Sequence, residues 1–512
     1  MRFRTLLGLV LCAAVTSSAQ ITNPPASIRS LSLRECIELA LSKNLDLRIE
    51  RLHQDMAADS LYGAYGVYDP VLSFTARRDF VSQPGDIDPK KPGTDLPYEL
   101  TTDSLGPALS GVLPFGLSYD LNAIEARQSI RTDFNSDTNA AALFPLGVRQ
   151  TNNYLASAGV TLQQHLLKDF WIDAARENLL IRRKDLKISQ QALRFQIMKT
   201  LLAVELAYYD LIAAREEIQV QEKALELRRQ FVADTQRRVQ VGDSPPLDDA
   251  QAETQLQNTL TQLAAAREVF SASQNRLIGL LTDDFNGWAG EDLQPTDALQ
   301  SIPVTVNRTD SFQSALSKRP DLIEARLAVE KTGAMVKFQF NQIFPSLDLV
   351  GGYGGLGIDS GFSSTMDDVF SFRNPEYSYG VVVSFPLSNV KERNNYRASK
   401  AAKQIAELQL KKAEQGVLLQ VADFVSSIEF RFSQVAYTRQ ARTYAEAALD
   451  AENKKFQNGF STSFVVLQSQ EILTAARTGE VRAEADYNKA LAQLAFAEGT
   501  IMERHHLGLE VK

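Results

Sequence analysis

Apolar and polar positions follow a helical period over two very long stretches of the chain, about residues 167–241 and 390–458. The first stretch is rich in Ala, Leu, Gln, Glu and Arg and contains neither Pro nor Gly. At 1.5 Å per residue, about 70 residues form a rod on the order of 100 Å long, which is stable only when it packs against others as a coiled coil. One helical face of the second stretch carries five apolar side chains, namely Val417, Val421, Phe424, Val425 and Ile428.

Each predicted rod ends at a turn that contains glycine. Gly242 follows the first rod and Gly459 follows the second. A second helical pattern then returns over residues 247–281 and 462–497, and Pro246 stands at the start of the first return helix, where proline is tolerated. The pattern therefore predicts two long antiparallel helical hairpins with glycine at their tips.

Four segments of about ten residues alternate with a period of two, which is typical of β-strands. One side of each strand is apolar or aromatic, and the other is small or polar. A half-buried strand of an ordinary sandwich alternates in the same way, but these segments also fit a transmembrane β-barrel with lipid outside and water inside. Joined to an export signal and two long rods, the strands favour the barrel. The alternation is read over residues 117–123, 156–163, 347–354 and 377–385, and the two halves have matching strands near residues 71–80 and 154–164 and near residues 346–355 and 376–387.

Part of the chain occurs twice. Residues 40–74 and 315–349 align without a gap at an offset of 275 positions, since Ala315 minus Ala40 is 275. In both copies a helical pattern runs into a proline and then into a strand pattern. A duplication on this scale predicts two structural repeats per chain.

The two predicted repeats differ in length in one place. From the proline to the tip glycine there are 172 residues in the first repeat, 70 to 242, and 114 in the second, 345 to 459, a difference of 58. The surplus lies in the β region, which has room for an extra hairpin with arms at residues 105–113 and 115–124. We therefore predict four strands in the first repeat and two in the second. The alternative is an extracellular loop that folds back on the barrel.

The N-terminus has the features of a cleaved secretory signal. Arg2 and Arg4 precede a short apolar core, and small residues end at Ala19. The core is too short to span a bilayer, and no later segment has 18 consecutive apolar residues, so we expect no transmembrane helix after the signal. An uncleaved anchor is the alternative.

The predicted divisions of the whole chain are a signal peptide 1–19, a first repeat 20–282 (helix 31–66, β region 70–165, hairpin 167–281), a linker 283–308, a second repeat 309–500 (helix 309–343, β region 345–387, hairpin 390–497) and a tail 501–512.

Composition excludes several kinds of function. The formal charge is −8, and removal of two arginines with the signal makes it −10, which argues against a nucleic-acid partner. Only Cys36 remains in the mature chain, so no intramolecular disulfide is possible, and its helical apolar surroundings predict burial. None of the four histidines has metal-ligand spacing, and no catalytic constellation is present. We therefore expect no enzyme activity, no cofactor and no metal.

At this level of organisation the chain resembles the TolC-like outer membrane factor family. The resemblance covers Leu31 to about Thr500 and rests on the twofold repeat, on the helix–proline–strand steps at Pro70 and Pro345, and on the glycine tips. It implies an α+β membrane protein that forms a homotrimer. The strands of three chains would join into one β-barrel in outer-membrane lipid, and their coiled-coil helices would form a tunnel across the periplasm. With four plus two strands per chain, that barrel would have 18 strands rather than the family's usual 12.

The resemblance also implies where partners bind. The tips would contact a periplasmic adaptor (membrane fusion) protein that is joined to an inner-membrane transporter. The adaptor-contacting residues would be Val241, Gly242, Asp243, Asn458, Gly459, Phe460 and Ser461. The candidate periplasmic gate comprises Asp248, Asp249, Phe456, Phe464, Val465 and Gln468.

The second tip departs from the family pattern. Val465 and Gln468 stand where acidic residues are expected, and Phe456 replaces a tyrosine, so the acidic ring cannot be transferred to this helix. Asp248 keeps the acidic position on the first tip. Phe456, Phe460 and Phe464 recur every four residues, and they form either an apolar gate or part of the coiled-coil core.

The predicted function is an outer membrane exit duct of a tripartite efflux or type I secretion system, through which substrates pass passively. The alternative is a periplasmic coiled-coil scaffold or adaptor that forms no pore. That alternative accounts for the rods and the signal, but it leaves the amphipathic strands unexplained. The sequence leaves open whether the cargo is a drug, a metal ion or a polypeptide.

Overall fold

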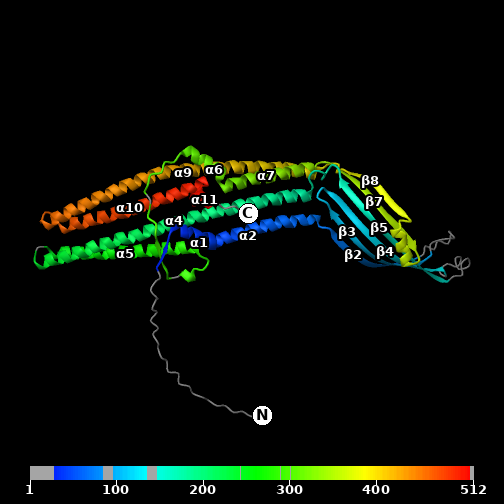
Figure 1. Cartoon of the computed structure of the whole chain (residues 1–512), viewed down its shortest axis with the longest axis horizontal. Helices are drawn as coiled ribbons and strands as arrows, with labels where there is room; N and C mark the ends of the chain where they lie inside the picture. Colours follow the sequence, from blue (N-terminus) through cyan, green and yellow to red (C-terminus); the bar gives the residue numbers. More distant parts are fainter. Residues whose placement is uncertain are drawn as a thin grey trace, which may run out of the picture. The chain divides into compact units, whose positions relative to one another are not determined.

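The computed structural model describes residues 28–84, 96–134, 147–242, 244–288, 290–299 and 301–507. The predicted signal peptide lies outside these residues. Within them the chain forms two compact units, and each unit draws on both halves of the sequence (Figure 1). The first unit combines residues up to 45 with 200–305 and 426–493, and the second combines 46–199, 306–425 and the residues from 494 onward.

The second unit contains a six-stranded antiparallel sheet whose strands are neighbours in the order β2, β3, β4, β5, β7, β8 (Figure 1). Four strands of this sheet lie between residues 71 and 165 and two between residues 346 and 384, so the predicted extra hairpin is part of the sheet and not a loop outside it. Its arms, at residues 98–112 and 117–133, are longer than the predicted 105–113 and 115–124. Its turn is closed by the N–H of Gly116, which donates to the carbonyl of Leu113 at 2.8 Å. The bounds are β2 Val71–Gln83, β3 Tyr98–Val112, β4 Leu117–Asp133, β5 Val148–His165, β7 Ser346–Asp359 and β8 Pro375–Ser384.

The register of the strands separates apolar from polar side chains. Directly paired residues point to the same side of a sheet, and the next row points to the opposite side. We call the two sides the apolar face and the polar face. One row of the apolar face is Leu72, Leu109, Leu121, Val160, Tyr353 and Tyr377, and the adjacent row of the polar face is Val71, Ser110, Asp120, Thr161, Gly352 and Ser378.

A short helix that the sequence analysis missed, α8 (Phe362–Phe370), packs against the apolar face. A Cβ atom added at Gly355 would lie 2.5 Å from the carbonyl oxygen of Val369, and one at Gly357 would collide with the carbonyl of Thr365. Both glycines pair with alanines of β5 on the apolar face. Glycine at these two positions therefore permits the helix to approach the strand backbone closely.

The helices recur at two fixed offsets. The helices α1 (Leu33–Lys43) and α6 (Arg308–Lys318) begin and end 275 positions apart, whereas α5 (Pro246–Leu281) and α10 (Ser463–Glu498) begin and end 217 positions apart. The two offsets differ by 58, which equals the difference between the proline-to-glycine spans of the two halves. The long helices are α4 (Ala174–Gln240) and α9 (Val390–Gln457). No helix among the described residues combines the length and the apolar composition needed to cross a membrane.

The predicted single helices at 31–66 and 309–343 are each broken in two. Asn44 separates α1 from α2 (Leu45–Ala64), and Arg319 separates α6 from α7 (Pro320–Asn341). Both residues have extended backbones, with ψ values of 128° and 122°. At the second break the reason is Pro320, which starts a helix well but disfavours helical geometry in the residue before it.

Most of the predicted linker is fixed to the helices of the first unit. Strand β6 (Asp292–Pro295) pairs in parallel with β1 (Ile28–Leu31). We call these two strands together with residues 296–299 and 301–305 the strap. The hydroxyl of Tyr208 on α4 donates to the carbonyl of Leu31 at 3.0 Å, and that of Tyr487 on α10 donates to the carbonyl of Ile302 at 2.7 Å. The two buried tyrosines therefore fasten the strap to one side of α4 and α10.

Candidate functional site

Both hairpin tips turn at a glycine in the left-handed region, with φ of +80° at Gly242 and +78° at Gly459. At the second tip the N–H of Gly459 donates to the carbonyl of Phe456 at 3.2 Å, and the N–H of Phe460 donates to that of Lys455 at 2.9 Å. This pair of bonds is a Schellman motif, which ends a helix and satisfies its last carbonyls. Of the other predicted tip residues, Val241, Asn458 and Phe460 are exposed, Ser461 is half-buried and Asp243 lies outside the described residues.

A carboxylate that the sequence analysis missed lies at the second tip. The hydroxyl of Ser461 donates to Glu452, and the Lys455 ammonium lies 3.1 Å from the same carboxylate. The hydrogen bond from Ser461, followed by that from Lys455, holds the pKa of Glu452 below its usual value. The second tip thus carries a fixed negative charge, although its two family acidic positions are Val465 and Gln468.

Phe456 belongs to the hydrophobic core near the tips. Its ring centroid lies 5.7 Å from that of Phe231, and the guanidinium of Arg238 lies 4.4 Å above the ring. The surrounding core comprises Phe231, Val232, Ala252, Ala445, Leu449, Val466, Leu467 and Leu473. This placement corresponds to the packing role considered for the phenylalanines, and the Phe456 side chain is half-buried.

The other gate candidates lie near the starts of α5 and α10. Phe464, Val465 and Gln468 are exposed on α10, and Asp248 and Asp249 are half-buried in the first turn of α5. A helix N-terminus stabilises negative charge at this position. The three phenylalanines at 456, 460 and 464 form no single stripe, because α9 ends at Gln457 and α10 begins at Ser463. Of these three phenylalanines, Phe464 is the one that is both exposed and part of a helix.

One buried cation connects the two hairpins, and no sequence motif pointed to it. Arg228 on α4 is buried, and its guanidinium donates to the carbonyl of Leu467 on α10 at 3.2 Å. Burial lowers the pKa of Arg228, and nearby Glu471 acts in the opposite direction. In the sequence, this contact is indicated only by the position of Arg228, a basic residue at a point of α4 where the helical period predicts a buried apolar side chain.

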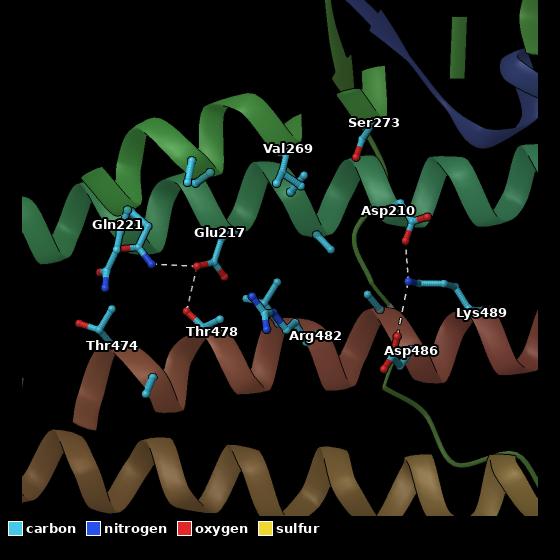
Figure 2. A pocket seen from close by; sticks show the side chains of 18 of the residues that line it. Asp210, Glu217, Gln221, Val269, Ser273, Thr474, Thr478, Arg482, Asp486 and Lys489 are labelled. Atoms are coloured by element: carbon cyan, nitrogen blue, oxygen red, sulfur yellow. Dashed lines mark hydrogen bonds and ion pairs between the residues drawn. The ribbon is translucent and has the colours of Figure 1, made fainter. Parts of the chain in front are cut away.

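A polar groove of about 750 Å³ lies between α4, α5 and α10 in the first unit (Figure 2). The ammonium of Lys489 lies 2.5 Å from Asp210 and 3.4 Å from Asp486. Further along, Glu217 accepts hydrogen bonds from Gln221 at 2.8 Å and from Thr478 at 3.0 Å. Two of these contacts, Thr478 with Glu217 and Lys489 with Asp210, join residues 261 and 279 positions apart, so polar side chains hold the two halves of the chain together along this groove.

The groove and the strap lie on opposite sides of the helices. Successive helical residues are about 100° apart, so Asp210 projects roughly 200° away from Tyr208 on α4, and Lys489 does so relative to Tyr487 on α10. Both tyrosines contact the strap, and both charged residues line the groove. Among the described residues, no group of three or more His, Cys, Asp or Glu side chains is placed to hold a metal ion.

The sequence matches the family model described as "Outer membrane efflux protein" over residues 125–282 and 312–500. The chain belongs to the outer membrane efflux protein family. Outer membrane efflux protein BepC of Brucella suis biovar 1 is 26% identical over 363 residues, which cover 69% of this chain and 74% of that protein. The pyoverdine export outer membrane protein OpmQ of Pseudomonas aeruginosa is also 26% identical, over 69% of each chain.

Solved structures show the same fold. A structure of CusC superposes with a TM-score of 0.66 at 17% identity and covers 94% of this chain and 95% of that one. The Campylobacter jejuni outer membrane channel CmeC gives a TM-score of 0.64 at 15% identity over 91% of this chain and 85% of that one. The TolC-like resemblance is therefore confirmed, and the chain is an α+β protein with the fold of these channels.

Family membership also decides between the two predicted functions. The chain is an outer membrane efflux channel protein, and its location is the outer membrane. The periplasmic scaffold that forms no pore is rejected. The same membership places the chain among transport proteins rather than among an enzyme family.

Proposed function

We propose that three copies of this chain form a passive exit duct in which each copy contributes its six strands to one 18-strand transmembrane barrel. The observation that carries this proposal is the sheet itself, with one apolar face, one polar face and two open edges. Strands β2 and β8 lie at those edges, and open edges of this length are an aggregation hazard unless they are paired. Pairing β8 of one copy with β2 of the next closes the barrel, because three sheets of six strands give 18.

The helices offer a second surface for the same assembly. Phe430, Tyr437 and Tyr444 follow one another at intervals of seven residues along α9, and their side chains are 74%, 72% and 66% exposed. Large aromatic residues at heptad spacing are suited to packing into a neighbouring helix as knobs into holes. A neighbouring copy would bury this stripe and complete the helical tunnel, with the groove on the tunnel side and the strap outside.

The proposal extends to the two repeats and the tips. Duplication of one helix–strand–hairpin unit accounts for the paired offsets of 275 and 217. The exposed tips around Gly242 and Gly459 would contact a periplasmic adaptor that is joined to an inner-membrane pump. Phe464, Val465 and Gln468, with Asp248 and Asp249 opposite, would line the periplasmic entrance as its gate.

We further propose that the chain performs no chemistry and requires no cofactor. Relatives with related sequences carry names that refer to pyoverdine export and to cation efflux. One architecture serving such different cargoes is expected if the pump, rather than the outer duct, selects the substrate.

Two neighbouring residues of β8 test the membrane proposal. Tyr379 lies on the apolar face and Ser378 on the polar face. A lysine facing lipid near the bilayer midplane costs about 2–4 kcal/mol, whereas one facing a water-filled lumen costs little. We expect Tyr379→Lys to reduce sharply the amount of heat-labile trimer in outer membranes, and Ser378→Lys to leave it nearly unchanged. Equal effects of the two variants would contradict a barrel with lipid on the apolar face.

A further inference from the structure

The helix α8 packs on the apolar face of the sheet at one place, over Gly355 and Gly357 of β7. Thr365 and Val369 point toward the strands and are buried. The glycines at 355 and 357 remove the side chains that would hold the helix away from β7. Because α8 lies on the face that carries Tyr353 and Leu349, it is outside the polar face and cannot line the same surface as Asp120 or Ser378.

The return from α8 to β8 is held by an aromatic stack and a strained residue. Phe372 has a φ of +51°, a left-handed conformation that a bulky side chain rarely adopts. Its ring is stacked on Tyr353, with centroids 5.4 Å apart. Asn374 and Leu356 are joined by two hydrogen bonds, of 3.0 Å and 3.3 Å. The stacking of Phe372 on Tyr353 and the two hydrogen bonds at Asn374 therefore offset the backbone strain at Phe372.

The free surface of α8 is amphipathic. Phe362 and Phe370 are 53% and 70% exposed, and Met366 lies between them on the same helical stripe. Asp367 is exposed about 100° from Met366 around the helix axis, and Ser363 is exposed two turns before Phe370, at the end of the helix nearer Asp359. A helix with exposed aromatic residues beside exposed polar ones, and with polar residues towards one end, is suited to the boundary between hydrocarbon and lipid headgroups.

The level of α8 on the sheet matches such a boundary. The apolar rows of the sheet end at the row of Gly357, which contains Glu125, and at the next row, a charged one composed of Arg78, Asp103, Arg127, Tyr154 and Asp359. In this row the Arg78 guanidinium donates to Asp103 at 2.5 Å and 2.9 Å. Asp359 lies just before α8, the helix packs on Gly357 and Gly355 in the next two rows, and Phe372, two residues after the helix, stacks on Tyr353 in the wholly apolar row. The segment from Asp359 to Phe372 therefore runs from polar to apolar side chains of the sheet.

We propose that α8 is an interfacial lipid-binding helix, which inserts Phe362 and Phe370 into the outer leaflet and fixes the depth of the barrel in the membrane. This inference rests on the proposed barrel, because it needs the apolar face of the sheet to contact lipid. The occupant of the exposed side of α8 is bilayer lipid, because the phenylalanines continue the apolar face of the sheet and the adjoining polar side chains suit the headgroup layer.

Site-directed spin labels in bilayers test the helix and the barrel separately. A nitroxide is attached at Phe370→Cys and Ser363→Cys on α8, and at Tyr379→Cys and Ser378→Cys on β8, in a Cys36→Ala background. Collisions with oxygen report exposure to hydrocarbon, and collisions with a water-soluble nickel complex report exposure to water. We expect the label at 370 to be protected from nickel and accessible to oxygen, at a shallower depth than 379, and those at 363 and 378 to be accessible to nickel.

Three other outcomes would overturn the role of α8, the barrel or both. A label at 379 in lipid with one at 370 open to nickel overturns the role of α8 and leaves the barrel intact. A label at 370 that is shielded from both reagents shows that protein covers it, which also overturns the lipid assignment. A label at 379 that is open to nickel rejects the barrel and the inference with it.

Discussion

Asn44 and Arg319, 275 positions apart, end equivalent helices and reach equivalent carbonyls. The Asn44 amide donates to the carbonyl of Leu280 at 3.1 Å, and the Arg319 guanidinium donates to that of Ala497 at 3.4 Å. The two acceptors are 217 positions apart, the offset between α5 and α10. Each bond therefore fastens a short leading helix to the end of the return helix of the same half.

Loss of these side chains is expected to destabilise the protein unequally. Arg319 is buried and also holds Asp321 in two bonds of 2.7 Å and 3.0 Å, so Arg319→Ala leaves a carboxylate without its partner. We expect Arg319→Ala to cost about 3 kcal/mol and Asn44→Ala about 1–2 kcal/mol. Urea unfolding in detergent measures both. Arg34→Ala, which removes an exposed arginine of α1, serves as the control and should change little.

The tip glycines give a prediction with an internal control. Gly459→Ala places a side chain at φ +78° and should destabilise the protein by about 1 kcal/mol, even though nothing lies within 4 Å of the added Cβ. Gly416 lies inside α9, also with free space around a Cβ, so Gly416→Ala should stabilise the protein by up to about 1 kcal/mol. Thermal unfolding followed by circular dichroism should show shifts of opposite sign. Shifts of the same sign would contradict the assigned backbone geometry.

Glu324 on α7 predicts a dependence of stability on pH. Burial, and to a smaller extent the carboxylates of Asp321 and Glu50, raise the pKa of Glu324 to about 7, while Lys199 opposes them. Because the folded pKa is above the unfolded value, the contribution of this group to stability is present below about pH 4.5 and is lost as the pH rises through 7.

The Glu324→Gln variant removes this titration. Its advantage over the parent in the free energy of unfolding, measured by urea unfolding at each pH, should grow between pH 5 and pH 8 and reach about 1–2 kcal/mol at pH 8, after allowance for partial solvent exposure. The control is Glu330→Gln on the same helix, where Lys184 supplies a partner for the carboxylate. An advantage of Glu324→Gln that is constant with pH would disprove this assignment.

The groove predicts a modest coupling between α4 and α10. A double-mutant cycle with Asp210→Asn and Lys489→Met should give an interaction energy of about 0.5–1 kcal/mol, because both side chains are partly exposed. The ion pair between Lys454 and Asp450, which is well exposed on one helix, should give a value near zero in the same measurement. Equal coupling at the two sites would show that the groove gives its ion pair no added strength.

The extra hairpin predicts a wide external mouth. Deletion of residues 98–133 removes β3 and β4 and leaves β2 and β5 in antiparallel directions, so three chains would close a 12-strand barrel. Barrel diameter grows roughly linearly with strand number. Neutral polymers added from the external side should therefore enter the parent channel at larger sizes than the deletion variant. An unchanged size limit would contradict the contribution of the hairpin to the barrel wall.

The sequence predicted the elements that depend on long periodic patterns. The ends of α5, α9 and α10 were predicted to within one residue, and the length difference between the halves located the extra hairpin. The helix α8 was missed because nine residues between two strands give no sustained period, and its seat depends on glycines in another strand. Arg228 and Lys489 were missed because their partners lie 239 and 279 positions away, and no local pattern reports such distant contacts.

Cys36 is wholly buried, and burial raises the pKa of its thiol to about 12. The thiolate is the form that reacts, so the folded chain keeps Cys36, the one cysteine outside the predicted signal peptide, inert in a compartment that oxidises thiols. A newly exported chain has no such protection before α1 packs. We therefore expect that fast packing of α1 limits disulfide formation between chains before the subunits assemble.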